Sequence, residues 1–249
     1  KFLVWFEKFL ITTPWPLIII LLSFLAWLSS RSIKLSIGTA ISFFLIGYFG
    51  MWKDTMSTMA IISVATLICL ILGAPIGILM ARSQRLTNIL SPVLDMMQTI
   101  PTFVYLIPII MLLGIGKVPG LLAVCVYAIP PIVRLTNLGI REVDKRFVEA
   151  AKALGIKKRV ILFKIEIPLA LPSIMTGVNQ TIMMALAMVV IASMIGVSGL
   201  GVPILRSISN QFLALGLMNG LAIVALAIIF DRISQNYARR IQKHKNAKR

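Results

Sequence analysis

The sequence predicts an all-α integral membrane protein with about seven transmembrane helices, an outside N-terminus and an inside C-terminus. Three observations support this prediction. Hydrophobic residues make up 59% of the 249 residues and charged residues only 13%, whereas soluble domains carry about 25% charged residues. Several apolar runs approach the roughly 20 residues that a helix needs to cross a bilayer. Lys and Arg also concentrate in alternate connecting segments, as the positive-inside rule describes.

Seven apolar segments are candidate spans. They are Ile11–Ser29, Leu35–Trp52, Met56–Ala81, Ile100–Ile115, Leu121–Val133, Ser173–Val197 and Gly216–Phe230. No small-residue cleavage site follows the first segment, so we expect a retained helix rather than a signal peptide. The fourth and fifth contain Pro108, Pro130 and Pro131, and a bilayer tolerates prolines only where protein or cavity water satisfies the freed backbone groups. We therefore expect these two segments to be buried in protein.

The basic residues set the orientation of the spans. With the N-terminus outside, the inside segments hold 20 of the 25 Lys and Arg residues. These segments are Arg31–Lys34, Arg82–Arg85, Arg134–Lys164 and the tail from Arg232. The other five are Lys1, Lys8, Lys53, Lys117 and Arg206, all outside. Removing one span would destroy this asymmetry. We divide the chain into peripheral transmembrane helices (1–54), a core (55–231) and a basic cytoplasmic tail (232–249).

The longest inside loop, residues 134–168, is predicted to contain two short amphipathic helices. Val148 and Ala151 lie at helical spacing, and a second apolar stripe follows from Val160. Gly155 between them suits a helix C-terminus or a sharp turn, and Pro168 suits a break before the next span. The chemistry of this loop leaves three interpretations open. It rests on anionic lipid, it docks a cytoplasmic partner as a helix in a groove, or it is a solvated loop.

Several function classes are disfavoured by the residues. The net charge of +17 does not indicate nucleic acid, because the basic residues are scattered between apolar runs rather than gathered on one face. Cys69 and Cys125 lie in apolar runs and His244 lies in the tail, so neither a metal site nor a disulfide is expected. A proton-coupled carrier is disfavoured because no chain of carboxylates runs through the spans. An integral-membrane enzyme would need a cluster of reactive side chains that the sequence lacks.

The loop resembles the EAA loop of ATP-binding-cassette (ABC) importer permeases. That motif reads E-A-A, three residues, G, nine residues, I, one residue, L-P, and here Ile167 stands where Leu is usual. In that family the loop forms coupling helices that insert into a groove of the ATPase subunit. The resemblance implies a type I ABC importer permease fold. It assigns ATPase coupling to Glu149, Ala150, Ala151, Gly155, Ile165 and Pro168.

Physical reasons fit these coupling residues. The two small alanines let a helix approach a partner closely, and Gly155 permits a tight bend. Glu149 can make a charge-assisted hydrogen bond at the rim of a groove. The alternative role for Glu149 is electrostatic stabilisation of a helix N-terminus.

Three longer stretches narrow the resemblance to permease subunits of glycine betaine/proline betaine importers. They are Met96–Gly116, Ile129–Val143 and Asn179–Gly201. This implies a homodimer of permeases, two ABC ATPase subunits and a periplasmic or membrane-anchored substrate-binding protein, in the bacterial plasma (inner) membrane. It also implies that this chain binds no cofactor and that the partner ATPase binds ATP-Mg. The sequence contains no G-x-x-x-x-G-K-[ST] phosphate loop, which agrees with that division of labour.

Candidate residues of the translocation path are polar or adaptable groups in or beside the spans. Polar groups there are costly unless they face protein or water. The candidates are Gln98, Thr99, Thr102, Tyr105, Asn179, Gln180, Met184 and Met188. The alternative for each is interhelical hydrogen bonding or ordinary packing. The segment Gly196–Phe212 is expected to be an outside re-entrant or short helical segment that closes the pore or meets the binding protein.

Two functions are carried forward. The first is an importer permease for glycine betaine or a related methylated osmolyte, such as proline betaine, choline, carnitine, trimethylamine oxide or dimethylsulfoniopropionate. The second is a stand-alone secondary carrier or an osmotically gated channel, which would work without an ATPase. Flux through this chain alone would distinguish the second from the first.

Overall fold

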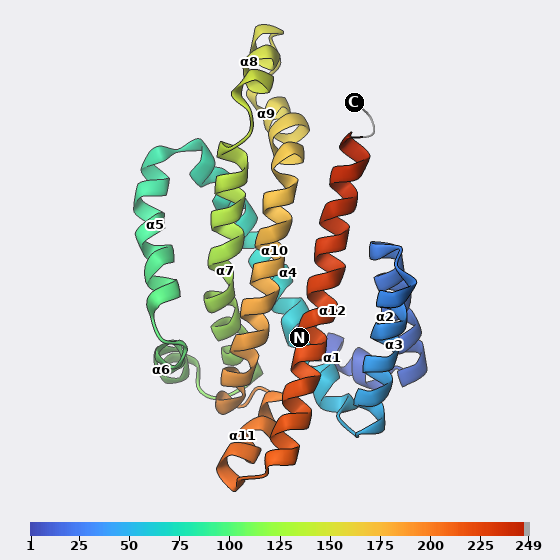
Figure 1. Cartoon of the computed structure of the whole chain (residues 1–249). Coiled ribbons are helices and arrows are strands. Elements are labelled where there is room, and N and C mark those ends of the chain that lie inside the picture. Colours follow the sequence, from blue (N-terminus) through green and yellow to red (C-terminus); the bar gives the residue numbers. More distant parts are fainter. Residues whose placement is uncertain (247–249) are drawn as a thin grey trace.

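The computed structural model describes the backbone of residues 1–246 and the side chains of residues 1–236. Every regular element in this part of the chain is helical. The α-helices are α1 Phe2–Thr12, α2 Trp15–Ser30, α3 Ile33–Tyr48, α4 Trp52–Arg82, α5 Gln84–Thr99, α6 Thr102–Leu113, α7 Lys117–Arg141, α8 Lys145–Ala153, α9 Lys158–Ile161, α10 Ile167–Ala192, α11 Gly201–Asn210 and α12 Leu213–Asn246. A π-helical turn, η1 Leu162–Glu166, precedes α10, and a short 3₁₀ turn, η2 Ser193–Ile195, follows it. Figure 1 shows an elongated bundle with α8 and α9 at one end and α11 at the other.

The centre of the bundle is formed by α4, α7 and α10, which pack closely along their lengths. Glycines make this close approach possible. A Cβ atom on Gly77 of α4 would lie 2.6 Å from the Val133 carbonyl oxygen of α7. A Cβ atom on Gly139 of α7 would lie 2.6 Å from the Cβ of Ser173 in α10. The sequence thus uses small residues at helix crossings, as membrane helices commonly do.

Each of the seven predicted apolar segments overlaps a helix, but the first, Ile11–Ser29, crosses the break between α1 and α2. Four helices in the described part of the chain are long and apolar enough to cross a membrane: Trp52–Arg82, Lys117–Arg141, Lys158–Ile195 and Leu213–Asn236. The number rises to six if each of two bent pairs is one span, α1 with α2 at 106° and α5 with α6 at 100°. The remaining segment is the shorter apolar helix α3.

The predicted boundaries were wrong at several places. The predicted tail from Arg232 begins inside a helix, because α12 continues to Asn246. Two further differences lie near the loop and the fourth segment. The fifth segment does not end at Val133, because α7 continues to Arg141; the loop therefore begins at Glu142 rather than at Arg134. Arg134 ended the apolar run but not the helix, because its guanidinium pairs with Asp95 on α5. The second difference is α5 itself, which precedes the fourth segment. Its many polar side chains hid it from a search for apolar runs.

The expected burial of the proline-containing segments holds for one of the two. Pro130 and Pro131 of α7 are buried. In contrast, α6 is largely open within this chain, and Met111 and Leu112 are 81% and 82% exposed. The expectation for the fourth segment was therefore wrong for the isolated chain, since the neighbouring helices leave its outer face uncovered.

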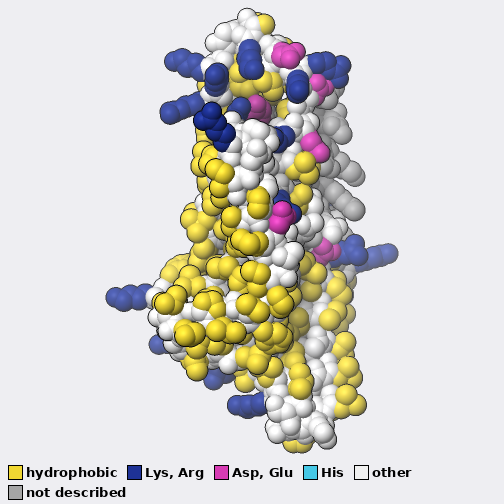
Figure 2. Space-filling model, turned by 90° about the vertical axis from the view of Figure 1, so that its left-hand side faces the viewer, with side chains coloured by type: hydrophobic (Ala, Val, Ile, Leu, Met, Phe, Trp, Pro, Cys, Tyr) yellow, Lys and Arg dark blue, Asp and Glu magenta, His cyan; other side chains and the backbone are white. Residues whose placement is uncertain are grey.

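Charge marks the two ends of the bundle. Figure 2 shows many Lys and Arg side chains around the α8 end and mainly hydrophobic side chains lower on that face. Lys53 lies in the first turn of α4, Lys117 begins α7 and Arg206 lies in α11, all at the opposite end. The α8 end is therefore the inside end under the positive-inside rule.

A buried ion pair fixes α1 to the core at the outside end. The Glu7 side chain of α1 is buried, and its carboxylate accepts hydrogen bonds from Lys117 Nζ at 2.6 and 2.8 Å. It also accepts from Ser57 Oγ at 2.9 Å and Ser198 Oγ at 3.2 Å. One carboxylate thus joins α1, α4, α7 and the turn before α11.

We expect Lys117→Met to destabilise the protein, because it leaves Glu7 buried without its counter-charge. Removing one partner of a buried pair costs about 3–5 kcal/mol, and partial exposure of Lys117 places the effect at the lower end. Thermal unfolding in detergent should show a lower midpoint. The double variant E7Q/K117M should recover part of the loss, because no buried charge remains; a midpoint unchanged by K117M would contradict this account.

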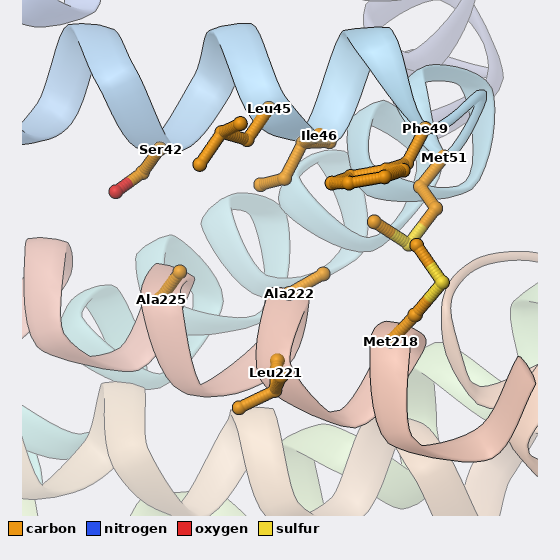
Figure 3. A pocket seen from close by; sticks show the side chains of 9 residues that line it. All are labelled: Ser42, Leu45, Ile46, Phe49, Met51, Met218, Leu221, Ala222 and Ala225. Atoms are coloured by element: carbon orange, nitrogen blue, oxygen red, sulfur yellow. The ribbon is translucent and has the colours of Figure 1, made fainter. Parts of the chain in front are cut away.

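An apolar cavity of about 240 Å³ lies between α3 and α12. Figure 3 shows its lining, in which Ile46 and Phe49 lie across from Ala222, and Met51 lies beside Met218. Its one hydroxyl, on Ser42, donates to the Gly38 carbonyl oxygen at 2.8 Å. The lining therefore offers no free polar group to hold a charged solute, and the functional site has to be sought elsewhere.

Candidate functional site

The segment of residues 142–166, called here the α8–α9 segment, carries the coupling motif at the inside end. Asp144 caps α8, and its carboxylate accepts from the Arg146 backbone N–H at 2.9 Å. Hydrogen bonds from the Arg146 side chain also hold the pKa of Asp144 below its usual value. The carboxylate therefore stays ionised at neutral pH and fixes the start of α8.

Gly155 ends α8 in the left-handed conformation, with φ of 71°. Its N–H donates to the Lys152 carbonyl oxygen at 2.9 Å, and the Ile156 N–H donates to that of Ala151 at 3.1 Å. These two bonds form a Schellman motif, which normally requires glycine at this position. The predicted pair of short helices joined at Gly155 is thus confirmed.

The outer side of the segment is open. Glu149 and Ala150 are exposed, and Leu154 and Phe163 are 80% and 64% exposed. Ala151 is buried, so its small side chain serves packing inside the chain. Ile165 is half-buried, so it too lies on the inner side of the segment.

The prediction of a helix break at Pro168, before the next span, was wrong. Pro168 lies near the start of α10, and the helix runs on from α9 through the π-helical turn η1. Proline has no N–H to donate to the carbonyl four residues earlier, here that of Lys164, and a wider turn at this place accommodates the missing bond. Lys158–Ile195 therefore forms one long helical rod, which links the α8–α9 segment to the core.

Polar contacts from Glu166, the last residue of this segment, and from Arg141, the residue just before it, hold both ends to the α4–α5 turn, which we define as residues 80–87. Arg82 at the end of α4 pairs with Glu166, the last residue of η1. Arg141 at the end of α7 donates to Gln84 Oε1 at 2.7 Å and to Thr87 Oγ1 at 2.8 Å. Sequence reasoning missed these roles for Arg141 and Glu166, because each pairs with residues far away in the chain.

The translocation candidates on α5 and α6 lie around the bend between these helices. Gln98 and Thr99 are exposed, and Thr102 and Tyr105 are half-buried. The Tyr105 hydroxyl donates to the Met97 carbonyl oxygen. The Tyr105 ring packs edge-on against Tyr127 of α7, with centroids 6.3 Å apart.

The candidates on α10 divide into two faces. Gln180 is exposed and Met184 half-buried, whereas Met188 is fully buried. Asn179 Nδ2 donates to Asp231 Oδ1 of α12 at 2.7 Å, and Ser234 Oγ donates to Asn179 Oδ1 at 2.6 Å.

The structure thus assigns packing contacts to Asn179 and Met188, while Gln180 stays open. No hydrogen bond among the described residues joins the α10 candidates to those on α5 and α6. This network also shows what sequence reasoning missed at Asp231, whose carboxylate tethers α12 to α10.

Spanning helices that cross at glycines, with a short helix pair projecting from the inside end, form the arrangement expected of the type I ABC importer permease fold. Residues 73–243 match the family described as binding-protein-dependent transport system inner membrane component, so the chain belongs to that family. In agreement, a chain of a MetNI methionine ABC transporter in an inward-facing conformation superposes with a TM-score of 0.68. The match has 20% identity and covers 74% of this chain and 93% of that one.

Curated relatives show higher identity. The glycine betaine/proline betaine transport system permease protein ProW of Escherichia coli K12 is 47% identical over 234 residues, covering 94% of this chain. This chain spans 66% of the length of that relative, slightly less than two thirds. The glycine betaine/carnitine transport permease protein GbuB of Listeria monocytogenes is 43% identical over 226 residues, covering 90% of this chain and 80% of that relative.

Proposed function

We propose that this chain is the permease subunit of an ATP-driven importer for glycine betaine or a related methylated osmolyte. Its partners are two ABC ATPase subunits at the inside end and a substrate-binding protein at the outside end. The chain itself is not an enzyme, and ATP-Mg is bound by the ATPase subunits. The observation that carries the proposal is the exposed α8–α9 segment, built on one helical rod with α10.

The surface of this segment suits a groove on an ATPase. Its exposed apolar side chains include Leu154 and Phe163, and Glu149, which is also exposed, offers a carboxylate that can accept a hydrogen bond. Short helices with apolar anchors commonly bind in grooves of partner proteins. Lys157, Lys158 and Arg159 are also exposed and are placed to meet anionic lipid headgroups.

A second permease copy would complete the pore, and we propose a homodimer. The support is the uncovered face of α6, where Met111, Leu112 and Ile107 are exposed. The proline in that helix, Pro108, is also exposed and needs a protein or water neighbour at membrane depth. A second copy seated on α6 supplies such a neighbour.

The translocation path needs only weak contacts with its cargo. A methylated ammonium group has no N–H donor and is attracted to aromatic faces. The half-buried Tyr105–Tyr127 pair offers such faces beside the polar end of α5. Selection among osmolytes is left to the binding protein, whose aromatic residues would hold the cation.

Uptake by the assembled complex tests the proposal. The chain, its ATPase and its binding protein are reconstituted in vesicles, and entry of radiolabelled glycine betaine is measured with ATP or a non-hydrolysable analogue inside. We expect uptake only with hydrolysable ATP and the binding protein. Flux through vesicles that hold this chain alone would instead establish the stand-alone carrier or channel.

We expect Glu149→Ala to weaken ATPase binding without disturbing the permease fold. Glu149 follows the first turn of α8, which contains no acidic residue, so helix N-terminal electrostatics is a minor role. Loss of a hydrogen bond to a charged group costs about 1.5–3 kcal/mol, which is about tenfold or more in affinity. Titration of the permease in nanodiscs with ATPase measures this, with Glu142→Ala as the matched exposed acid. Equal affinities for both variants would contradict the assignment.

A further inference from the structure

The α8–α9 segment is held at both ends to the same short stretch of chain, the α4–α5 turn. The contacts at one end come from Arg141, the last residue of α7, which directly precedes the segment. Those at the other end come from Glu166, which precedes α10. The turn lies between α4, which packs in the core, and α5, which stands further out beside α7 (Figure 1). It is therefore placed to pass a displacement of the segment into α5.

Arg141 makes the larger set of hydrogen bonds. Besides Gln84 and Thr87, its Nη2 reaches the Met80 carbonyl oxygen at 3.0 Å, and its Nε donates to Asn137 Oδ1 at 2.9 Å. The Thr87 hydroxyl donates in turn to the Met80 carbonyl oxygen at 2.8 Å. A planar guanidinium holds several donors in fixed directions, so this arrangement fixes the end of α7 relative to the turn.

Glu166 makes the second contact, an ion pair that its buried carboxylate needs. Its side chain is buried, with the residue only 5% exposed, and it pairs with Arg82. A buried carboxylate needs a counter-charge, because it cannot recover its hydration inside the protein. The pair therefore obliges the end of α4 and the π-helical turn to stay together.

The turn leads directly into the helix that carries part of the candidate path. Gln84 and Thr87 belong to the first turn of α5, and Gln98 and Thr99 lie at its other end. A displacement of the α8–α9 segment thus has two routes into the core. One follows the continuous rod into α10, and the other passes through Arg141 and Glu166 into α5.

We propose that Arg141 and Glu166 are positioning residues that transmit movement of the α8–α9 segment to α5 through the α4–α5 turn. This rests on the proposed function, in which an ATPase moves that segment. When the contacts of either residue with the α4–α5 turn are lost, ATP hydrolysis continues but no longer rearranges α5 and α6. Hydrolysis then loses its dependence on the cargo-loaded binding protein.

The experiment uses the complete complex in nanodiscs or vesicles and compares ATPase rates with and without loaded binding protein, together with uptake. The variants are Arg141→Gln, Arg82→Glu, Glu166→Arg and the double swap R82E/E166R. The matched control is Arg85→Gln, which removes an exposed arginine from the same turn. Arg85 has no hydrogen-bond or ion-pair partner among the described side chains.

We expect Arg141→Gln and each single swap to lower the stimulation of hydrolysis by about tenfold, a typical coupling strength between sites. The double swap should restore most of it, because the ion pair re-forms, and Arg85→Gln should resemble wild type. A purely structural role would lower the amount of assembled complex and leave the ratio of stimulated to basal rates intact.

Two results would overturn the inference: stimulation in Arg141→Gln equal to that in Arg85→Gln, or a double swap no better than its single swaps. If a single swap fails to assemble, Glu166→Gln replaces it; normal stimulation in that variant counts against the ion pair, and reduced stimulation supports it. Failure of the proposed function looks different, because then the wild-type complex itself shows no ATP-driven uptake.

Discussion

Replacing Gly155 by proline is expected to abolish uptake by the assembled complex while leaving insertion in the membrane intact. Proline fixes φ near −65°, whereas Gly155 has φ of 71°. It also removes the N–H that donates to the Lys152 carbonyl oxygen. Both bonds that close α8 depend on this geometry, so α8 would leave its orientation relative to α9. Hydrolysis would continue without transport.

The variant Gly155→Ala provides a graded control for this prediction. A Cβ atom at Gly155 meets no neighbour within 4 Å, so alanine suffers only the strain of the left-handed conformation, about 1–2 kcal/mol. We expect it to keep a substantial part of uptake. Uptake, hydrolysis and the amount of permease in the membrane are measured for both variants. Normal transport by Gly155→Pro would exclude a coupling role for the segment.

Replacing Gly77 by leucine is expected to have a comparably large effect, but on assembly of the chain itself. A Cβ atom on residue 77 would lie 2.6 Å from the backbone carbonyl oxygen of Val133 and 2.7 Å from the Cβ of Thr136. A backbone atom cannot move aside as the end of a side chain can. Forcing extra carbon atoms into a packed site costs about 1–3 kcal/mol or more, so α4 and α7 should separate.

The matched control is Gly38→Leu, because a Cβ atom on Gly38 in α3 meets nothing within 4 Å. Fluorescence-detected size exclusion after heating measures the fraction of folded protein for both variants. We expect Gly77→Leu to give little folded protein and Gly38→Leu to resemble wild type. Similar stability of the two would contradict the close α4–α7 packing.

The spans and the α8–α9 helix pair were predictable from the sequence because local patterns specify them. An apolar run predicts a span whatever it packs against, and Gly155 predicts a helix end because its conformation is local. The helix α5 was not predictable in this way, since its polar side chains interrupt any apolar run. The end of α7 was missed for a related reason, because polarity at Arg134 reflects a tertiary partner rather than a loop.

The site was predictable where a motif lies in one stretch of chain. The contacts of Arg141 and Glu166 with the α4–α5 turn were not predictable. Gln84 lies 57 residues from Arg141, and Arg82 lies 84 residues from Glu166. Asn179 was selected from the sequence, but its role was left open, because a polar residue in a span indicates either the translocation path or interhelical packing. Only the position of Asp231 on α12 distinguished the two.

The most direct test of the central claim is photo-crosslinking from the tip of α8 in the working complex. A photoreactive amino acid replaces Leu154, which is 80% exposed, or Ile208 in α11, which is 71% exposed at the other end. After illumination, covalent adducts are identified by mass spectrometry in complexes that carry out ATP-driven uptake. We expect an adduct with the ATPase subunit from position 154 and none from position 208. An active complex that gives no ATPase adduct from position 154 would contradict docking of the ATPase on the α8–α9 segment.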